Sequence, residues 1–325
     1  MRASTSPLRP NSICSVSASS VISEFGARVL AVGVATLDLI NEVAAYPSED
    51  AEVRALAQRQ ARGGNAPNTL AVLAQLGHRC VWCGTLADDA GGRFIAADLA
   101  RRGIALAAVE RITGAATPTS YVTLSRVSGS RTIVHHRDLP ELNVAGFARV
   151  GLDGFDWVHF EGRNPAETAE MMRRVRRLRP QARVSVELEK ARPGIESLAA
   201  LADLVLVGRD YVCADGGDEP PARALARLAT LAPRACWVLG WGEGGAWSQV
   251  PGAAPRHHPA WPLARVVDSL GAGDCLNAAV IDGLLRGHAL AEASARAVRL
   301  AGFKCTRVGV DDLIEAACAT AGVLD

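Results

Sequence analysis

Short apolar runs alternate with amphipathic segments along the chain from about residue 28 onward. In the amphipathic segments apolar residues recur at three- and four-residue spacing, which is typical of helices packed on one face. Continuous apolar runs are typical of parallel strands that are covered on both faces. The alternation therefore predicts an α/β fold with a doubly wound, mostly parallel sheet flanked by helices. The strands are expected at 29–34, 80–85, 157–160, 183–188, 204–207 and 236–239, and the helices at 67–76, 93–102, 168–178, 195–201, 222–231, 272–286, 290–305 and 312–321.

Two segments, at about 37–62 and 117–137, break this alternation. The first contains extended stretches at 37–46 and 52–62 around the polar turn 47–50, and the second contains stretches at 119–126 and 131–136 around the turn 127–130. Each pattern predicts a β-hairpin rather than a strand–helix–strand unit. Two hairpins outside the parallel sheet can pair into a small second sheet. Because ligands of such folds bind at the carboxyl edge of the parallel strands, we interpret the hairpins as a lid over that edge. Plain surface ribbons are the alternative.

The first 27 residues differ in composition from the rest. Residues 1–20 are rich in serine, carry two arginines and hold no acidic residue. An organellar transit peptide has this composition, but we interpret the segment as a disordered extension. A single α/β domain is then expected over 28–325.

Charge is balanced along the chain, with 35 Lys and Arg against 34 Asp and Glu, so the net charge is +1. This balance indicates no global attraction to nucleic acid or to an anionic membrane surface. Hydrophobic residues make up 49% of the chain, which fits a globular protein. No uninterrupted apolar stretch approaches the roughly 18 residues of a membrane span. Any partner must therefore be recognised by local chemistry.

The eight cysteines are too sparse for a disulfide scaffold, so a reducing compartment, the cytoplasm, is expected. Cys80 and Cys83 have the spacing of a zinc knuckle, but no second pair accompanies them. We interpret them as half-buried strand residues.

A glycine-rich loop, Gly240-Trp-Gly-Glu-Gly-Gly245, matches the spacing of a dinucleotide-binding fingerprint. That fingerprint needs a helix beginning at the loop, so that a pyrophosphate can bind the helix amino terminus. Residues 246–251 instead have the pattern of a strand that runs into a proline-rich turn. An NAD(P)-dependent oxidoreductase is therefore kept only as a minor alternative.

A second glycine pair precedes the helix expected at 272–286. Gly271, Ala272 and Gly273 can direct successive amides at one point, and the helix amino terminus adds positive charge, so the loop forms an anion hole suited to a phosphoryl group. Asp274 follows directly. It is either a helix cap or a general base that takes a proton from an alcohol attacking a γ-phosphate. Capping does not explain the paired glycines, which favours the base.

A polar cluster stands before the helix expected at 67–76. Gly64 permits close approach of a ligand to the backbone, and Asn65 and Asn68 carry amides that both donate and accept, as sugar hydroxyls require. Asp38 follows the first strand, where it can accept from two vicinal hydroxyls. Each residue alone is typical of a cap or a turn. Together with the anion hole they predict a polyol site beside a nucleotide phosphate.

These two motifs resemble the signatures of the ribokinase (PfkB) family of carbohydrate kinases. The first is Gly63-Gly-Asn65 with Asn68 and Gly77, and the second is Asp268-Ser-Leu-Gly-Ala-Gly-Asp274. The resemblance covers nearly the whole chain from about residue 29. Within the family the chain is most similar to the ketohexokinase (fructokinase) branch, through stretches at 46–50, 58–65, 128–132, 159–164, 184–190 and 265–268.

The resemblance implies a ribokinase-like fold with a β-sheet lid. It also implies ATP-dependent transfer of a phosphoryl group to a ketohexose, with the 1-hydroxyl of D-fructose first. Asp274 is then the base, and the amides of Gly271, Ala272 and Gly273 form the anion hole. Sugar contacts are implied for Asp38, Gly64, Asn65, Asn68 and Arg131, and nucleotide contacts for Trp241, Glu243, Gly245 and Pro262 together with Gly271 and Gly273. A homodimer through the lids is implied, in which Asp50 reaches the sugar of the neighbouring subunit.

The chain departs from the wider family at residues 207–212, Val-Gly-Arg-Asp-Tyr-Val, where an Asn-x-x-Glu pair that organises magnesium is missing. Mg²⁺ is still expected with ATP, because it neutralises phosphate charge. The carboxylate that orders the ion stays open among Glu161, Glu187 and Glu189, and so does a requirement for K⁺. Ribose, a nucleoside, another ketose or a phosphorylated sugar are the alternative acceptors, and a non-catalytic sugar sensor is a further alternative class.

Overall fold

The computed structural model describes residues 26–324 except 129, 215, 217 and 218. The extension expected at 1–27 lies outside the described residues apart from its last two. Ala27 already belongs to the fold, since its backbone N–H donates to His78 Nδ1 at 3.2 Å.

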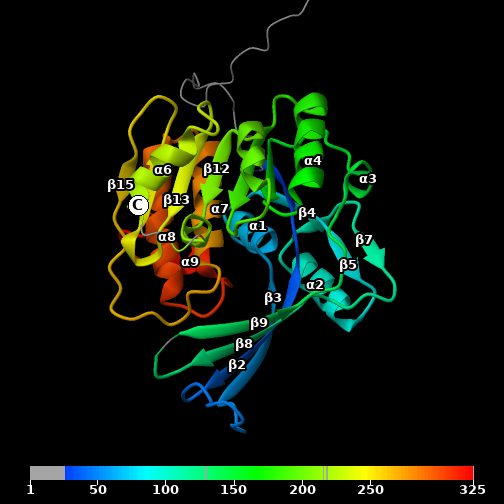
Figure 1. The fold of residues 1–325 in the computed structure, drawn as a ribbon, viewed down its shortest axis with the longest axis vertical. Helices are drawn as coiled ribbons and strands as arrows, with labels where there is room; N and C mark the ends of the chain where they lie inside the picture. The colour runs from blue at the N-terminus through cyan, green and yellow to red at the C-terminus, as the bar shows by residue number, and fades with distance from the viewer. Residues whose placement is uncertain (1–25, 129, 215, 217–218, 325) are drawn as a thin grey trace, which may run out of the picture.

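A nine-stranded sheet organises the described part of the chain (Figure 1). Its order is β15-β14-β13-β12-β11-β10-β1-β4-β6, and the seven strands from β13 to β6 run parallel. The prediction of a mostly parallel sheet is therefore confirmed. The strands are β1 (Arg28–Val32), β4 (Arg79–Cys83), β6 (Ala105–Leu106), β10 (Trp157–Glu161), β11 (Arg183–Leu188), β12 (Leu204–Val207), β13 (Cys236–Gly240), β14 (Ala246–Gln249) and β15 (Arg256–His258).

Helices cover both faces of this sheet, because alternate strand residues are apolar on both sides. In β1, Val29 and Ala31 pack into one core cluster and Leu30 and Val32 into the other. The first cluster is completed by α1 (Asn65–Gln75), α2 (Ala90–Arg101), α7 (Ala272–Leu285), α8 (Leu290–Cys305) and α9 (Leu313–Cys318). The second is completed by α3 (Val144–Phe147), α4 (Pro165–Leu178), η1 (Ile195–Leu201) and α6 (Pro221–Ala229). The short α5 (Arg209–Val212) follows β12.

The segment expected as a helix at 195–201 is a 3-10 helix, η1. Ile195, Leu198 and Leu201 recur every three residues, and in the tighter 3-10 form this spacing brings them onto one face. Ile195 and Leu198 are buried there. The expected position is correct, and the helix type differs.

The two predicted hairpins form a separate four-stranded sheet in the order β3-β2-β8-β9. β2 (Thr36–Val43) pairs antiparallel with β3 (Ala57–Gly63), β8 (Thr119–Ser125) pairs antiparallel with β9 (Arg131–His136), and a parallel β2–β8 pair joins them. This lid sheet projects from the body of the molecule, at the bottom of Figure 1. The first hairpin corrects the prediction in one respect, since its second strand begins at Ala57 rather than near residue 52.

Three smaller features complete the fold. A two-stranded sheet pairs β5 (Thr85–Ala87) with β7 (Glu110–Ile112). Cys80 and Cys83 are buried as free thiols, and burial raises the pKa of both to about 12. None of the helices in the described residues combines the length and apolar character that a membrane crossing needs.

Candidate active site

Asp274 lies in the first turn of α7, where the two sequence motifs meet in space. Its side chain is buried, and its Oδ2 accepts a hydrogen bond of 2.8 Å from Asn68 Nδ2 at the start of α1. Gly271 caps α7 with a φ of 79°, a left-handed conformation that favours glycine. Apart from its chain neighbours and the backbone of its own helix, no described atom lies within 4 Å of a Cβ built on Gly273, so the loop opens onto space that a ligand can fill.

Negative charge is concentrated around Asp274. Burial, followed by the charges of Glu189 and Glu161, raises the pKa of Asp274 well above the ordinary carboxyl range, while the hydrogen bond from Asn68 opposes the rise. Burial, followed by the charge of Asp274, likewise raises the pKa of Glu187. A carboxyl group with a raised pKa is suited to exchange protons near neutral pH.

Glu187, at the end of β11, is held by two asparagine amides. Its oxygens accept from Asn65 Nδ2 at 3.1 Å and from Asn277 Nδ2 at 2.8 Å. Asn65, expected to bind sugar, is therefore in the site but engages Glu187. Asn277 was not predicted from the sequence. The sequence could have identified Asn277 through its position three residues after Asp274, which puts both side chains on one face of α7.

The carboxylates do not form a ready metal centre. Among the residues described, no set of three His, Cys, Asp or Glu side chains is arranged to hold a metal ion. One oxygen of Glu161 accepts from the Val34 backbone N–H at 2.8 Å, and the other lies 3.4 Å from Arg163. The structure therefore does not rank Glu161, Glu187 and Glu189 as the carboxylate that orders a metal ion.

Asp38 approaches the same region from β2 of the lid. Its Oδ1 accepts from Thr36 Oγ1 at 2.9 Å, and a Cβ on Gly63 would lie 2.3 Å from its Oδ2, so a larger residue at 63 would displace this carboxylate. Burial raises the pKa of Asp38, while hydrogen bonds from Thr36 and Ser120 act against the rise. Ser120 Oγ also lies 3.2 Å from His135 Nδ1, a polar neighbour that was not predicted from the sequence.

One cavity brings three of the predicted residues together. Asp38, Asn68 and Gly271 line a space of about 590 Å³ between the lid, α2 and the loops at 268–271 and 308–311. Asp274 is not among the residues that line it. Gly64 lies at the α1 amino terminus with a φ of 103°, and a Cβ there would lie 2.0 Å from the Val34 carbonyl oxygen. The backbone therefore requires glycine at this position for packing.

Both lid hairpins contact the loop that precedes Gly271. Arg131 of β9 donates to Ser269 Oγ, and Arg59 of β3 lies 3.5 Å from Asp268 Oδ2. Lys304 of α8 holds the same loop through Asp268. Its fully buried Nζ donates to the Asp268 carbonyl oxygen at 2.7 Å and lies 3.2 Å from the Asp268 carboxylate. The structure therefore places Arg131 beside the loop that precedes Gly271, and its contact with sugar and phosphate stays a prediction.

The cavity lined by Asp38 and Asn68 does not include the residues expected at the nucleotide, Trp241, Glu243, Gly245 and Pro262. Trp241 contacts Trp247 edge-on at 6.5 Å between ring centroids, and Glu243 and Pro262 are exposed. A Cβ on Gly245 would lie 2.1 Å from the His258 carbonyl oxygen, so this glycine is needed for packing. Nucleotide contact by these residues remains a prediction. The segment after Gly245 is strand β14, which removes the geometric basis for a dinucleotide fingerprint.

Asp50 is not brought together with Asp274 within one chain. It is exposed in the loop between β2 and β3, with a φ of 60°. That loop lies at the free end of the lid sheet, away from the nine-stranded sheet (Figure 1).

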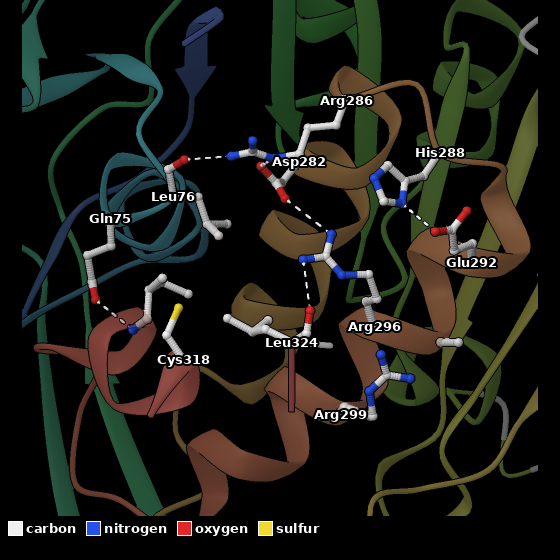
Figure 2. A pocket seen from close by; sticks show the side chains of 12 residues that line it. Gln75, Leu76, Asp282, Arg286, His288, Glu292, Arg296, Arg299, Cys318 and Leu324 are labelled. Carbon is white, nitrogen blue, oxygen red and sulfur yellow. Dashed lines mark hydrogen bonds and ion pairs between the residues drawn. The ribbon is translucent and has the colours of Figure 1, made fainter. Parts of the chain in front are cut away.

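A second cavity of about 560 Å³ lies between α1, α7 and α8 and contains none of the predicted residues (Figure 2). Its arginines are engaged with the fold itself. Arg286 donates to Asp282 at 2.7 Å, and Arg296 and Arg299 donate to the backbone carbonyls of Leu324 and Val323. We interpret these contacts as holding the last described residues against α8.

Solved structures share this architecture. The chain superimposes with a TM-score of 0.77 on a putative ribokinase from Agrobacterium tumefaciens, with 22% identity over 90% of this chain and 97% of that one. The adenosine kinase from Sinorhizobium meliloti gives a TM-score of 0.74 and 24% identity, over 91% of this chain and 99% of that one. The fold is therefore ribokinase-like, as expected.

Sequence comparison defines the family. The model of the pfkB family of carbohydrate kinases matches residues 27–317. The chain is also 38% identical over 295 residues to a mouse protein, ketohexokinase, covering 88% of this chain and 99% of that protein. The chain belongs to the pfkB family and is a carbohydrate kinase, so the resemblance found in its motifs is confirmed.

Proposed function

We propose that this carbohydrate kinase transfers the γ-phosphoryl group of MgATP to the 1-hydroxyl of a ketohexose, with D-fructose the preferred acceptor. The observation that carries the proposal is the buried Asp274 carboxylate, which is oriented by Asn68 beside a cavity lined by Asp38 and Gly271. The 38% identity to a ketohexokinase supports the choice of sugar.

The proposed reaction is an in-line displacement at phosphorus. The sugar oxygen forms a bond to the γ-phosphorus, the bond to the β-phosphate oxygen breaks, and ADP leaves with that electron pair. The hydroxyl proton passes to Asp274 late in a loose transition state. The amides of Gly271, Ala272 and Gly273 stabilise the charge on the transferred group. Mg²⁺ enters as part of the nucleotide substrate and neutralises phosphate charge.

Asp38, Asn68 and Arg131 are proposed to hold and cover the sugar. Thr36 and Ser120 hydrogen-bond the Asp38 carboxylate, which keeps further acceptor sites for two hydroxyls of the substrate. The contact of Arg131 with Ser269 supports a role for this guanidinium at the transferred phosphoryl group.

A homodimer through the lid sheets is part of the proposal. In the register of the lid, Tyr121 stands opposite Val134 on the face away from Asp38, and these side chains are 51% and 66% exposed. A second lid can cover this apolar surface. Asp50, at the free end of the lid, would then reach the neighbouring sugar site. The sparse cysteines fit the cytoplasm as the place of action.

The test is ADP release with MgATP over D-fructose, ribose, adenosine and fructose 6-phosphate, with Asp274→Asn as the blank. The expected result is the highest kcat/KM with D-fructose and a 1-phosphate product, identified by NMR. A preference of tenfold or more for ribose or adenosine would reject the ketohexose and favour the alternative acceptors.

A further inference from the structure

Arg62, near the end of β3, is a buried cation beside the catalytic base. Only 1% of its side chain is exposed. Its Nη1 donates to Asn68 Oδ1 at 2.9 Å, and its Nε donates to Asp98 Oδ2 of α2 at 2.8 Å. Asn68 in turn donates to Asp274, so a continuous chain of hydrogen bonds runs from Asp98 to the base.

The chemistry of the guanidinium group sets the direction of this chain. A guanidinium has donors and no acceptor, so the atom of Asn68 that faces Arg62 must be the amide oxygen. The amide nitrogen of Asn68 must then face Asp274 and donate to its Oδ2. The bond from Asn68 fills one of the two acceptor sites of Oδ2, which makes Oδ1 the less engaged oxygen for a proton from a substrate.

We infer, on the basis of the proposed function, that Arg62 is a positioning residue that locks the Asn68 amide so that Asp274 presents Oδ1 to the attacking hydroxyl. Asp98 anchors Arg62 and balances its charge. Asp98 suits this role because it also accepts from Arg101 and Arg102 on its own helix, at 2.7 and 2.9 Å.

The electrostatic surroundings of Asp274 make the loss of Arg62 measurable. Asp274 faces Arg62 from β3, Glu161 from β10, and Glu187 and Glu189 from β11 and the residue after it. The positive charge of Arg62 lowers the pKa of Asp274 against the effect of burial. Without Arg62 the Asn68 amide can also turn and present its oxygen, which favours a protonated Asp274.

The sign of the expected change follows from the role of a base. Asp274 must be deprotonated to accept a proton, so kcat/KM falls as pH drops through its pKa. Removing Arg62 raises that pKa, and the acidic limb of the pH profile therefore moves to higher pH. A purely structural role for Arg62 would lower stability without moving this limb.

The test compares Arg62→Met with Arg93→Met in pH profiles of kcat/KM for the sugar and of kcat. Arg93 is the control, because it is an exposed arginine of the same helix as Asp98 and does not line the cavity that contains Asn68. For Arg62→Met we expect the acidic limb to move up by about one pH unit and kcat to fall on the order of tenfold. Arg93→Met is expected to superimpose on the wild type.

Arg62→Lys carries the same test if the methionine variant does not fold. A lysine keeps the charge, but its single ammonium group lacks the fork that holds Asn68 and Asp98 together. We expect its kcat to fall several-fold, with a limb closer to that of the wild type. Wild-type kcat and an unmoved limb in a folded Arg62 variant would overturn the inference.

Asp274→Asn, measured alongside, separates this inference from the proposed function. Near-normal turnover in Asp274→Asn would reject the base and the proposed function with it. A large loss in Asp274→Asn, combined with wild-type behaviour of the Arg62 variants, would reject only the role of Arg62.

Discussion

The region around Asp274 and the lid sheet differ in how their polar residues are held. Asp274, Asn68 and Arg62 are hydrogen-bonded to one another within one chain. In the lid, all six residues of β9 are exposed, and the loop with Asp50 lies free at the far end. The hydrogen bonds around Asp274 therefore form within a single chain. The proposed role of Asp50 instead requires a second subunit.

This difference indicates a division of labour. Groups that react must be held in place before the substrate arrives, and buried hydrogen bonds provide that rigidity. Groups that enclose the substrate must move, and they belong to a layer with few buried contacts. Lys304 and Arg131 contact neighbouring residues of one loop, Asp268 and Ser269, so this loop is where the two regions meet.

Replacing Lys304 by methionine is expected to destabilise the region around Asp274 most. Burial acts to raise the pKa of Asp268, but hydrogen bonds from Gly309 and the charge of Lys304 lower it, so this carboxylate is ionised and buried. Without Lys304 this charge would keep only the half-exposed Arg59, at 3.5 Å, and two backbone N–H groups. We expect the free energy of unfolding in urea to fall by about 3–5 kcal/mol. The exposed Lys190→Met is the control and should change it by no more than about 0.5 kcal/mol; equal values for the two variants would refute the anchoring role of Lys304.

Substitutions in the lid should instead lower activity by removing a contact between the two subunits of the proposed dimer. We expect Asp50→Ala to lose about tenfold in kcat/KM for the sugar, because a charge-assisted hydrogen bond is removed, and Glu49→Ala in the same loop to lose little. Mixing Asp50→Ala with Asp274→Asn should restore activity to about a quarter of the wild type, since half of the exchanged dimers hold one intact site.

That mixing experiment has a clear negative outcome. If sedimentation shows that subunits exchange and activity does not recover, Asp50 does not act across the dimer. If the wild type is monomeric at the assay concentration, the lid-to-lid contact itself is rejected.

The fold was predictable where the pattern of side chains has one physical explanation. β11, β12 and α8 have the predicted bounds, because an apolar run covered on both faces or a regular amphipathic stretch leaves few alternatives. The start of β3 was not predictable, because Ala57–Gly63 is Ala-Gln-Arg-Gln-Ala-Arg-Gly, with no apolar alternation. Its strand structure comes from pairing with β2, which is a tertiary effect.

The site was predictable in its main groups and less so in its supports. Asp274, Asn68 and Asp38 stand in motifs whose chemistry can be recognised locally. Asp98 lies 36 residues from Arg62, and Asn277 lies 90 residues from Glu187. Contacts over such separations depend on how the elements pack, and single-sequence patterns contain no record of that packing.

The central claim is tested most directly by the rate of phosphoryl transfer in a single turnover, with MgATP and D-fructose both saturating, in the wild type and in Asp274→Asn. Our account predicts that the variant binds both substrates and transfers the phosphoryl group slower by a factor on the order of a hundred or more, as expected for loss of a general base. A transfer rate within a few-fold of the wild type would contradict it.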